Sequence, residues 1–463
     1  MLRPMTRPLK NISLLLAIII LTTFLVSCNQ ELDEPVQILE AAENESLLAD
    51  ADDLTSVPAE PSATPTLPPP PTIAISPTPT LSPTPFVIQN PSPPCGVELP
   101  TILPDVETNY DWELPPIADE LVPEDAKPAI EYLYANPNDV SVVVFQVDYE
   151  GIGYYHNADS PMPLASVNKL IHLVAWAKAV ENGEFDPNQI VSRDELDEWY
   201  LRGSDLGAHR DALREFDGQD LTQDDVAWMM IRHSSNAAAD YFHDLLGQQR
   251  IEQTAAELGF TSHTAPCTWL GRFLTVSTIP SGDLSLLEAD PTAYGAMVSD
   301  RQDRFMQDPD FRQFGENTWR RGGQPSFQKE SYFTETFDTK GTALDYGRLM
   351  AQLIQDEVGT PATSRLIRSH LEWPIVEFPS NRVRYNTVGY KNGTLPGVLT
   401  TLYYAEPYWA DRPIVVALFY RNLPRSTYQR WRREFPHDAL AHWLMTNPQG
   451  IHVMHVLRDS AEN

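Results

Sequence analysis

Residues Pro161–Lys169 read PMPLASVNK, with Ser166 three positions before Lys169. Apolar residues follow at helical spacing: Leu170, Leu173, Val174, Ala177 and Val180. This pattern predicts a helix that begins near Ser166, where backbone N–H groups are free and the helix dipole is positive. A serine hydroxyl is a weak nucleophile that needs a base, and a lysine of lowered pKa can serve. The spacing alone leaves two interpretations open: a nucleophilic serine with the lysine as its base, or an N-capping serine beside a solvated lysine.

A second Ser-x-x-Lys occurs at Ser326 and Lys329. It follows the glycine-containing segment Arg320–Pro325, for which we expect a loop without helical continuation. We interpret this second occurrence as coincidence.

The segments before Ser166 predict a helix and a β-hairpin. The helix opens at Pro123–Asp125, with an apolar face made by Ile130, Leu133 and Tyr134. A strand over Val140–Tyr149, a turn at Glu150–Gly151 and a strand over Ile152–His156 follow, because β-branched and aromatic residues dominate both runs.

The segments after Ser166 predict a helical block and then more strands. The block runs to about Gln355. The next three strands are expected at Arg384–Tyr390, Leu399–Ala405 and Ile414–Tyr420. A last helix is expected over Thr427–Leu444, with Trp431, Phe435, Leu440 and Trp443 as its apolar residues. This order predicts a mixed α+β (α/β) fold: a five-stranded antiparallel sheet flanked by terminal helices, an all-α lobe, and a cleft between them.

Two further motifs match this layout. Ser234-Ser235-Asn236 precedes a helical run in the middle block, and Lys391-Asn392-Gly393-Thr394 ends a late strand. The sequence Ser-x-x-Lys, Ser-x-Asn and Lys-x-Gly, in that order, resembles the penicillin-recognising serine enzymes, and class A β-lactamases most closely. The resemblance runs from Val140 to the end of the last helix.

The resemblance implies a role for each motif residue. Ser166 would be acylated, with Lys169 as its base. Ser234 would pass a proton to the leaving nitrogen, and Lys391 would orient Ser234 and attract the substrate carboxylate. The substrate-binding residues would be Asn236, which holds the amide side chain, together with Asn392, Gly393 and Thr394. The backbone N–H groups of Ser166 and Thr394 would form the oxyanion hole, and Gly393 would let its strand approach the substrate.

Three departures from the class A pattern stand out. Ser235 replaces the usual Asp, a change we interpret as structural, and Asn392 replaces the usual Thr or Ser. No Glu between Glu252 and Glu377 lies in the Glu-x-x-Leu-Asn motif that carries the deacylating base. Glu316, Glu330 and Glu335 lie in the segment Leu274–Phe337, which has no clear counterpart in the family, and nothing in the sequence selects one of them as a substitute.

These features leave three functions open. The first is a class A-like β-lactamase that hydrolyses β-lactam amides through an acyl-enzyme. The second is a D-alanyl-D-alanine peptidase-like, penicillin-binding-protein-like or esterase-like enzyme with slow deacylation. The third is a catalytically idle binding domain, which the joint retention of the motif residues disfavours because a binding module does not need that set.

Composition excludes other function classes. The 463-residue chain has a net charge of −31, which argues against nucleic-acid binding. The histidines, among them His209, His233, His243 and His263, show no zinc spacing, and no glycine-rich phosphate loop occurs. We therefore expect no metal, no cofactor and no nucleic-acid partner; the expected partner is a β-lactam or peptidoglycan-like small molecule, bound by a monomer.

The N-terminus resembles a lipoprotein signal peptide over residues 1–28. Arg3, Arg7 and Lys10 precede an apolar run, Ile12–Val26, that is short for a membrane span. It ends in Leu25-Val26-Ser27-Cys28, which resembles a bacterial lipobox and implies lipidation of Cys28. The chain would then be anchored on the outer face of the bacterial membrane or in the cell envelope; the alternative is an uncleaved anchor helix.

Residues 29–104 read as a disordered acidic spacer rich in Pro, Thr and Ser, followed by a hydrolase domain over 105–463. The segment 58–94 contains 14 prolines in 37 residues, a composition that favours extended polyproline II. The alternative is a Pro-motif ligand for a partner protein. Cys95 and Cys267 are the thiols left after lipidation, and in an oxidising compartment we expect them to pair.

Overall fold

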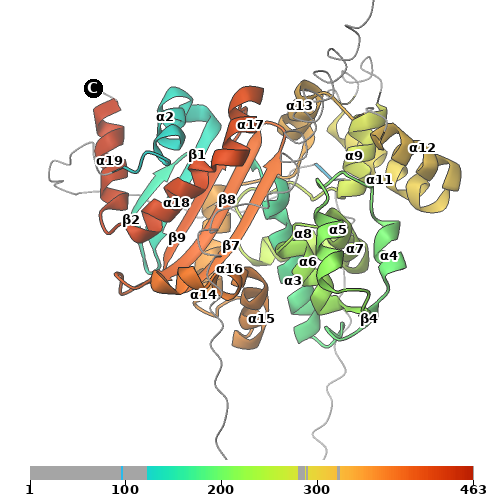
Figure 1. The fold of residues 1–463 in the computed structure, drawn as a ribbon, viewed down its shortest axis with the longest axis horizontal. Helices are drawn as coiled ribbons and strands as arrows, with labels where there is room; N and C mark the ends of the chain where they lie inside the picture. The colour runs from blue at the N-terminus through green and yellow to red at the C-terminus, as the bar shows by residue number, and fades with distance from the viewer. Residues whose placement is uncertain (1–94, 97–121, 280–286, 288–289, 321–323, 462–463) are drawn as a thin grey trace, which may run out of the picture. The chain divides into compact units, whose positions relative to one another are not determined.

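Five strands form an antiparallel sheet in the spatial order β2-β1-β9-β8-β7 (Figure 1). Their bounds are β1 Val140–Gln146, β2 Tyr149–His156, β7 Tyr385–Leu395, β8 Val398–Pro407 and β9 Ile414–Tyr420. The computed structural model describes residues 95–96, 122–279, 287, 290–320 and 324–461, all within the unit Leu81–Asn463. The predicted signal segment, Cys28 and most of the predicted spacer lie outside these residues.

The sheet is buried on both faces because its strands alternate between two cores. In β1, Val143 and Phe145 join one hydrophobic cluster, whereas Val142 and Val144 join the other. This is the period-two pattern of a strand whose neighbouring side chains point to opposite faces.

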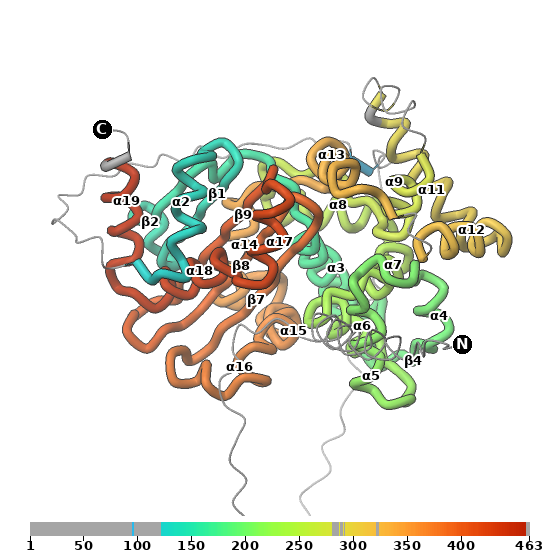
Figure 2. The backbone as a smooth tube through the Cα atoms, turned by 45° about the horizontal axis from the view of Figure 1, so that its top comes forward, coloured from blue at the N-terminus to red at the C-terminus, as the bar shows by residue number. Residues whose placement is uncertain are grey.

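Each face is covered by helices from different parts of the chain. The N-terminal helix α2 (Lys127–Ala135) and the C-terminal helix α18 (Pro436–Thr446) pack together against one face, beside α17 (Arg425–Glu434) and α19 (Gly450–Ala461) (Figure 2). On the opposite face, α14 (Ala343–Ile354) contacts β1, β8 and β9. The two ends of the domain therefore build one layer, while the middle of the chain supplies the other.

Most of the remaining helices form the α-lobe. They are α3 Lys169–Glu181, α4 Arg193–Glu198, α5 Ala208–Glu215, α6 Gln223–Ile231, α7 Asn236–Leu246, α8 Gln248–Glu257, α9 Trp269–Thr278, α11 Pro291–Gln307, α12 Pro309–Arg320, α13 Phe327–Phe337 and α15 Pro361–Leu371. The short helix α16 (Trp373–Glu377) instead packs against β7, the edge strand of the sheet. Two short ribbons, β3 (Met162–Pro163) with β6 (Lys340–Gly341) and β4 (Ile190–Val191) with β5 (Leu221–Thr222), connect parts of this lobe. In the part of the chain that the structure describes, no helix combines the length and the apolar character needed to cross a membrane.

The predicted fold class, with its five-stranded antiparallel sheet, is confirmed, and several element boundaries are wrong. The strand predicted to end at Tyr390 continues to Leu395. The hairpin turn falls at Val147-Asp148 instead of Glu150–Gly151, because Asp148 adopts the left-handed conformation (φ 65°) that a tight turn needs. The predicted last helix is two helices that break at Phe435 (φ 50°), since the following Pro436 disfavours a helical residue before it.

A disulfide joins Cys95 to Cys267, 172 residues apart in sequence. Both cysteines are buried in a small hydrophobic cluster with Tyr294 and Phe337. Next to the bridge, the Gly96 N–H donates to the Ala265 carbonyl at 2.9 Å. The disulfide therefore fixes this point of the chain to the segment that leads into α9.

Candidate active site

Ser166 lies in a short 3-10 turn, Ala165–Asn168, that leads directly into α3. The sequence predicted a helical first turn here, and the turn is tighter than an α-helix. Ala165 has a φ of 47°, a conformation that costs a non-glycine residue free energy and persists only where its neighbours enforce it. The preceding Leu164 is held at both backbone groups, because its N–H donates to Thr339 and its carbonyl accepts from the Thr400 hydroxyl, both at 2.9 Å.

Lys169 is completely buried one turn after Ser166. Its Nζ donates to the Ser234 carbonyl at 2.5 Å and to Asn236 Oδ1 at 2.7 Å. Burial lowers the pKa of Lys169 to about 7, although Asp205 and Asp240 favour the charged form. A substantial fraction of this amine is therefore neutral near pH 7, as a general base requires.

Ser234 lies at the break between α6 and α7 and is reached by two lysines. Its Oγ accepts from Lys391 Nζ at 3.0 Å and lies 3.4 Å from Lys169 Nζ. Burial, together with the charge of Lys169, holds the pKa of Lys391 well below its usual range. Asn236, Lys169, Ser234 and Lys391 therefore form one continuous hydrogen-bonded chain from three separate parts of the sequence.

Strand β7 runs beside the Ser166 turn, and only glycine fits at the closest point. A Cβ on Gly393 would lie 2.7 Å from the Ser166 backbone nitrogen and 2.4 Å from Thr400 Oγ1. Gly393 thus lets the strand approach the backbone around Ser166. Asn392 and Thr394, the flanking residues of β7, are half-buried, and the Asn392 carbonyl accepts from Lys391 Nζ at 2.8 Å.

The sequence did not predict two neighbours of Lys169, Asp240 and Trp269. Asp240, one helical turn after Asn236 on α7, accepts the backbone N–H groups of Trp269 and Leu270, both at 2.7 Å. It therefore holds the first turn of α9, and burial raises the pKa of its carboxyl group. The indole ring of Trp269 in turn lies 4.7 Å from Lys169 Nζ. The i, i+4 spacing of Asn236 and Asp240 was the available signal for the first; nothing in the sequence marks Trp269.

A family model described as the β-lactamase enzyme family matches residues 126–430, which include all of these motifs. The chain belongs to the β-lactamase enzyme family. This confirms the resemblance to the penicillin-recognising serine enzymes and supports a serine hydrolase of the β-lactamase or penicillin-binding type.

Solved structures of β-lactamases and of PBP-A are similar to the chain at low identity. A β-lactamase from Sphaerobacter thermophilus is 19% identical, with 69% of this chain and 98% of that chain covered and a TM-score of 0.42. A β-lactamase from Xanthomonas campestris is 13% identical, with 69% and 98% covered and a TM-score of 0.43. A PBP-A variant in an acyl-enzyme complex with penicillin G is 16% identical, with 68% and 95% covered and a TM-score of 0.38. No curated protein sequence matches the chain.

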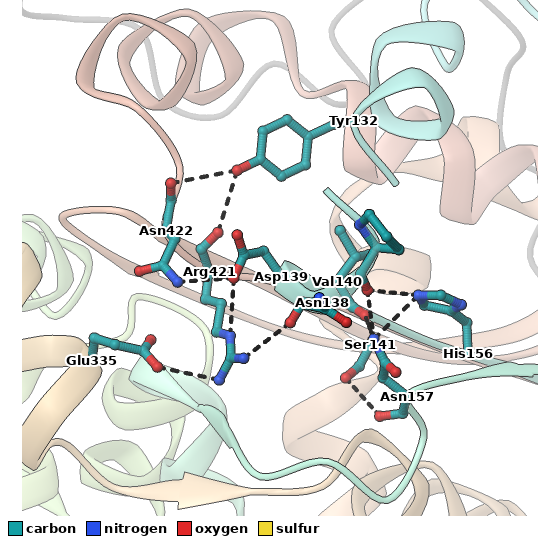
Figure 3. Close-up of polar contacts among 11 residues, drawn as sticks. Tyr132, Asn138, Asp139, Val140, Ser141, His156, Asn157, Glu335, Arg421 and Asn422 are labelled. Atoms are coloured by element: carbon teal, nitrogen blue, oxygen red, sulfur yellow. Dashed lines mark hydrogen bonds and ion pairs between the residues drawn. The ribbon is translucent and has the colours of Figure 1, made fainter. Parts of the chain in front are cut away.

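The three glutamates considered as substitutes for the family's deacylating base, Glu316, Glu330 and Glu335, each lie near an arginine. Figure 3 shows Glu335 turned toward Arg421, whose Nη1 donates to it at 3.2 Å while its Nε donates to Asp139. Glu316 pairs with Arg312 and Arg320 along α12. Burial raises the pKa of the Glu330 carboxyl group, and the charge of the nearby Arg272 offsets part of this increase.

The second Ser-x-x-Lys does begin a helix, so the prediction of a loop without helical continuation is wrong. Ser326 is the N-cap of α13, and its Oγ accepts the Lys329 backbone N–H at 3.2 Å. The sequence Phe327–Phe337 contains no Gly or Pro and continues the helix from this cap. Lys329 Nζ donates to the Ile279 carbonyl at 3.0 Å instead of approaching Ser326 Oγ.

Three of the buried or half-buried histidines contact an acidic side chain or each other. His233 lies within 2.8 Å of Glu215, and the buried rings of His172 and His243 are 3.2 Å apart, nitrogen to nitrogen. Among the residues with described positions, no group of three His, Cys, Asp or Glu side chains could hold a metal ion.

Proposed function

We propose that the chain is a class A β-lactamase-like hydrolase in which Ser166 opens a β-lactam amide and becomes acylated. The observation that supports this most is the burial of Lys169, which leaves its amine able to accept a proton one turn from Ser166. Without that neutral amine, the Ser166 hydroxyl would have no activating base.

The proposed proton path starts at Ser166 and uses the hydrogen-bonded chain of Lys169, Ser234 and Lys391. Lys169 takes the proton of Ser166 as its oxygen attacks the carbonyl carbon. The amide C–N bond then breaks, and the leaving nitrogen takes a proton from the Ser234 hydroxyl, which Lys169 or Lys391 replenishes because both reach it. The backbone N–H groups of Ser166 and Thr394 would stabilise the negative charge on the carbonyl oxygen.

A second candidate is the same acylation followed by slow release, as in a D-alanyl-D-alanine peptidase-like enzyme acting on a peptidoglycan-like substrate. The observation in its favour is Trp269, because an indole ring lies beside Lys169. An indole cannot accept a proton from water as a carboxylate can. Hydrolysis of the acyl-enzyme would then lack a base at the position of Trp269.

The test is acylation itself. The purified protein is mixed with a chromogenic cephalosporin while hydrolysis and intact mass are followed together. We expect an adduct on the wild type, none on Ser166→Ala, and an unchanged adduct on Ser326→Ala, the matched control in the other Ser-x-x-Lys. An adduct that maps to Ser326 contradicts the assignment, and a folded protein with neither adduct nor hydrolysis supports the idle binding domain.

Turnover separates the two candidates. For slow deacylation, rapid mixing should show a burst equal to the enzyme concentration and then a shallow linear phase. Glu316→Gln, Glu330→Gln and Glu335→Gln should each leave the linear phase nearly unchanged. A linear trace from time zero that one of these substitutions slows by about 10²-fold or more would identify a true hydrolytic base and a β-lactamase.

A further inference from the structure

Ser235, the residue between Ser234 and Asn236, is completely buried, and its side chain makes two contacts. Its Oγ accepts the Ala238 N–H at 3.2 Å, as the N-cap of α7, and lies 2.9 Å from His209 Nδ1. His209, on α5, is also completely buried, and its Nε2 lies 3.0 Å from Asp197 Oδ1. A hydrogen-bond relay thus runs from the Ser-x-Asn motif through an imidazole to a carboxylate that is half exposed to solvent.

Each link of the relay joins groups that can form a hydrogen bond. The Asp197 carboxylate can only accept, so Nε2 of His209 carries the hydrogen of that contact. The Ser235 hydroxyl accepts from Ala238 and can also bond to Nδ1, because a hydroxyl can both donate and accept. Both ring nitrogens of His209 therefore have a hydrogen-bond partner.

The relay bears on catalysis because Ser234 is in a strained conformation. Its φ of 61° is rare for a residue with a side chain and needs enforcement from its surroundings. Lys169 and Lys391 bind its carbonyl and hydroxyl oxygens, but the chain direction after Ser234 depends on Ser235. The ring of Tyr200 lies 4.6 Å from the imidazole of His209, and the Asp205 carboxylate accepts the backbone N–H of His209 at 2.9 Å. The first contact packs against the imidazole, and the second holds the backbone that carries it.

We propose that His209 is a positioning residue for acylation, acting through Ser235 to hold the Ser234 hydroxyl between Lys169 and Lys391. The Ser235 position is also where the sequence lacks the Asp that class A enzymes usually have. Here the carboxylate of Asp197 stands at the far end of a two-step relay. The expected effect on acylation rests on the proposed function of Ser166. The hydrogen bonds of the relay do not depend on a substrate.

The kinetic test follows adduct formation with benzylpenicillin at several concentrations. These measurements give a binding constant and, separately, a first-order rate constant for acylation. An asparagine at 209 can place a polar atom near the Nδ1 position, whereas a glutamine reaches the Nε2 position. We expect His209→Ala and His209→Gln to lower the acylation rate constant by about 10²-fold, with binding changed far less. His209→Asn should recover most of the loss, because it restores the contact with Ser235.

Two further arms test the coupling. Ser235→Ala should reproduce the loss, and the double variant Ser235→Ala/His209→Ala should lose no more than either single one. His233→Asn is the matched control, because His233 precedes Ser234 directly but contacts Glu215. Additive losses, equal losses in the Asn and Gln variants, or wild-type acylation by His209→Ala would each overturn the proposal.

Hydrogen exchange of the substrate-free protein separates this proposal from the proposed function. Amide exchange in the segment Arg232–Asp240 should accelerate in His209→Ala and stay unchanged in His233→Asn, with thermal unfolding confirming that both are folded. A wild type that forms no adduct would defeat the proposed function, while accelerated exchange would still support the relay. Unchanged exchange in His209→Ala would defeat the relay even if Ser166 is acylated.

Discussion

At the scale of single residues, the site depends on two lysines kept out of water beside one serine hydroxyl. A lysine amine in solution is charged at neutral pH and cannot accept a proton. Burial disfavours the charged form, and the indole of Trp269 adds an apolar wall 4.7 Å from Lys169 Nζ. The two lysines also disfavour each other's charge, so the pair has difficulty carrying two protons at once.

The pH dependence of acylation follows from the lowered pKa of Lys169. Below about 7 the amine is mostly protonated and cannot act as a base, so the acylation rate constant should fall about tenfold per pH unit. Above about 7 the rate should level off, because the neutral form already dominates. Rapid-mixing measurements of adduct formation across about pH 5 to 9 would show this.

Lys329→Arg provides the control for that profile, since it removes the lysine of the other Ser-x-x-Lys. Its profile should match that of the wild type. A wild-type rate that is flat through pH 7, or that rises as the pH falls, would contradict Lys169 as the base.

At the scale of elements, the sequence predicted best where burial alone decides the structure. Ile414–Tyr420 matches β9 residue for residue, since a run of seven apolar residues buried on both faces leaves no other assignment. The turn at Asp148 and the break at Phe435 were misplaced because each depends on the φ of one residue.

The Ser-x-x-Lys, Ser-x-Asn and Lys-x-Gly motifs predicted which residues meet. Asp240 and Trp269 could not be found this way, since their relation to Lys169 arises only when α9 packs against α7.

The disulfide is the element-scale feature with the most direct effect on stability. It precedes α9 by two residues and closes a loop of 172 residues. Cys267→Ser should therefore lower the free energy of unfolding by about 2–4 kcal/mol, measured by urea denaturation under oxidising conditions. Cys95→Ser should cost the same, and the double variant no more. Equal unfolding midpoints for wild type and Cys267→Ser, or additive losses, would show that the bridge does not form.

At the scale of the whole molecule, charge and composition divide the chain into unlike parts. Residues 29–126 contain no Lys or Arg and 19 Asp or Glu, whereas every motif residue lies after residue 126. Lys127 is the first basic residue after Lys10. We propose that the acidic, proline-rich segment serves as a spacer between a membrane anchor and the hydrolase domain. Like charges along such a segment repel one another and favour extension.

Lipidation of Cys28 is the prediction that belongs to this scale. The apolar run Ile12–Val26 is 15 residues long, against about 20 for a spanning helix, so a cleaved signal fits it better than an anchor helix. Two or more acyl chains hold a protein stably on a bilayer, and one does not.

Full-length protein made in bacteria with an alkyne fatty acid should carry the label and fractionate with membranes. Cys28→Ser should lose the label, whereas Cys95→Ser should keep it. An unlabelled wild type that retains residues 1–27 by mass spectrometry would instead establish the uncleaved anchor helix.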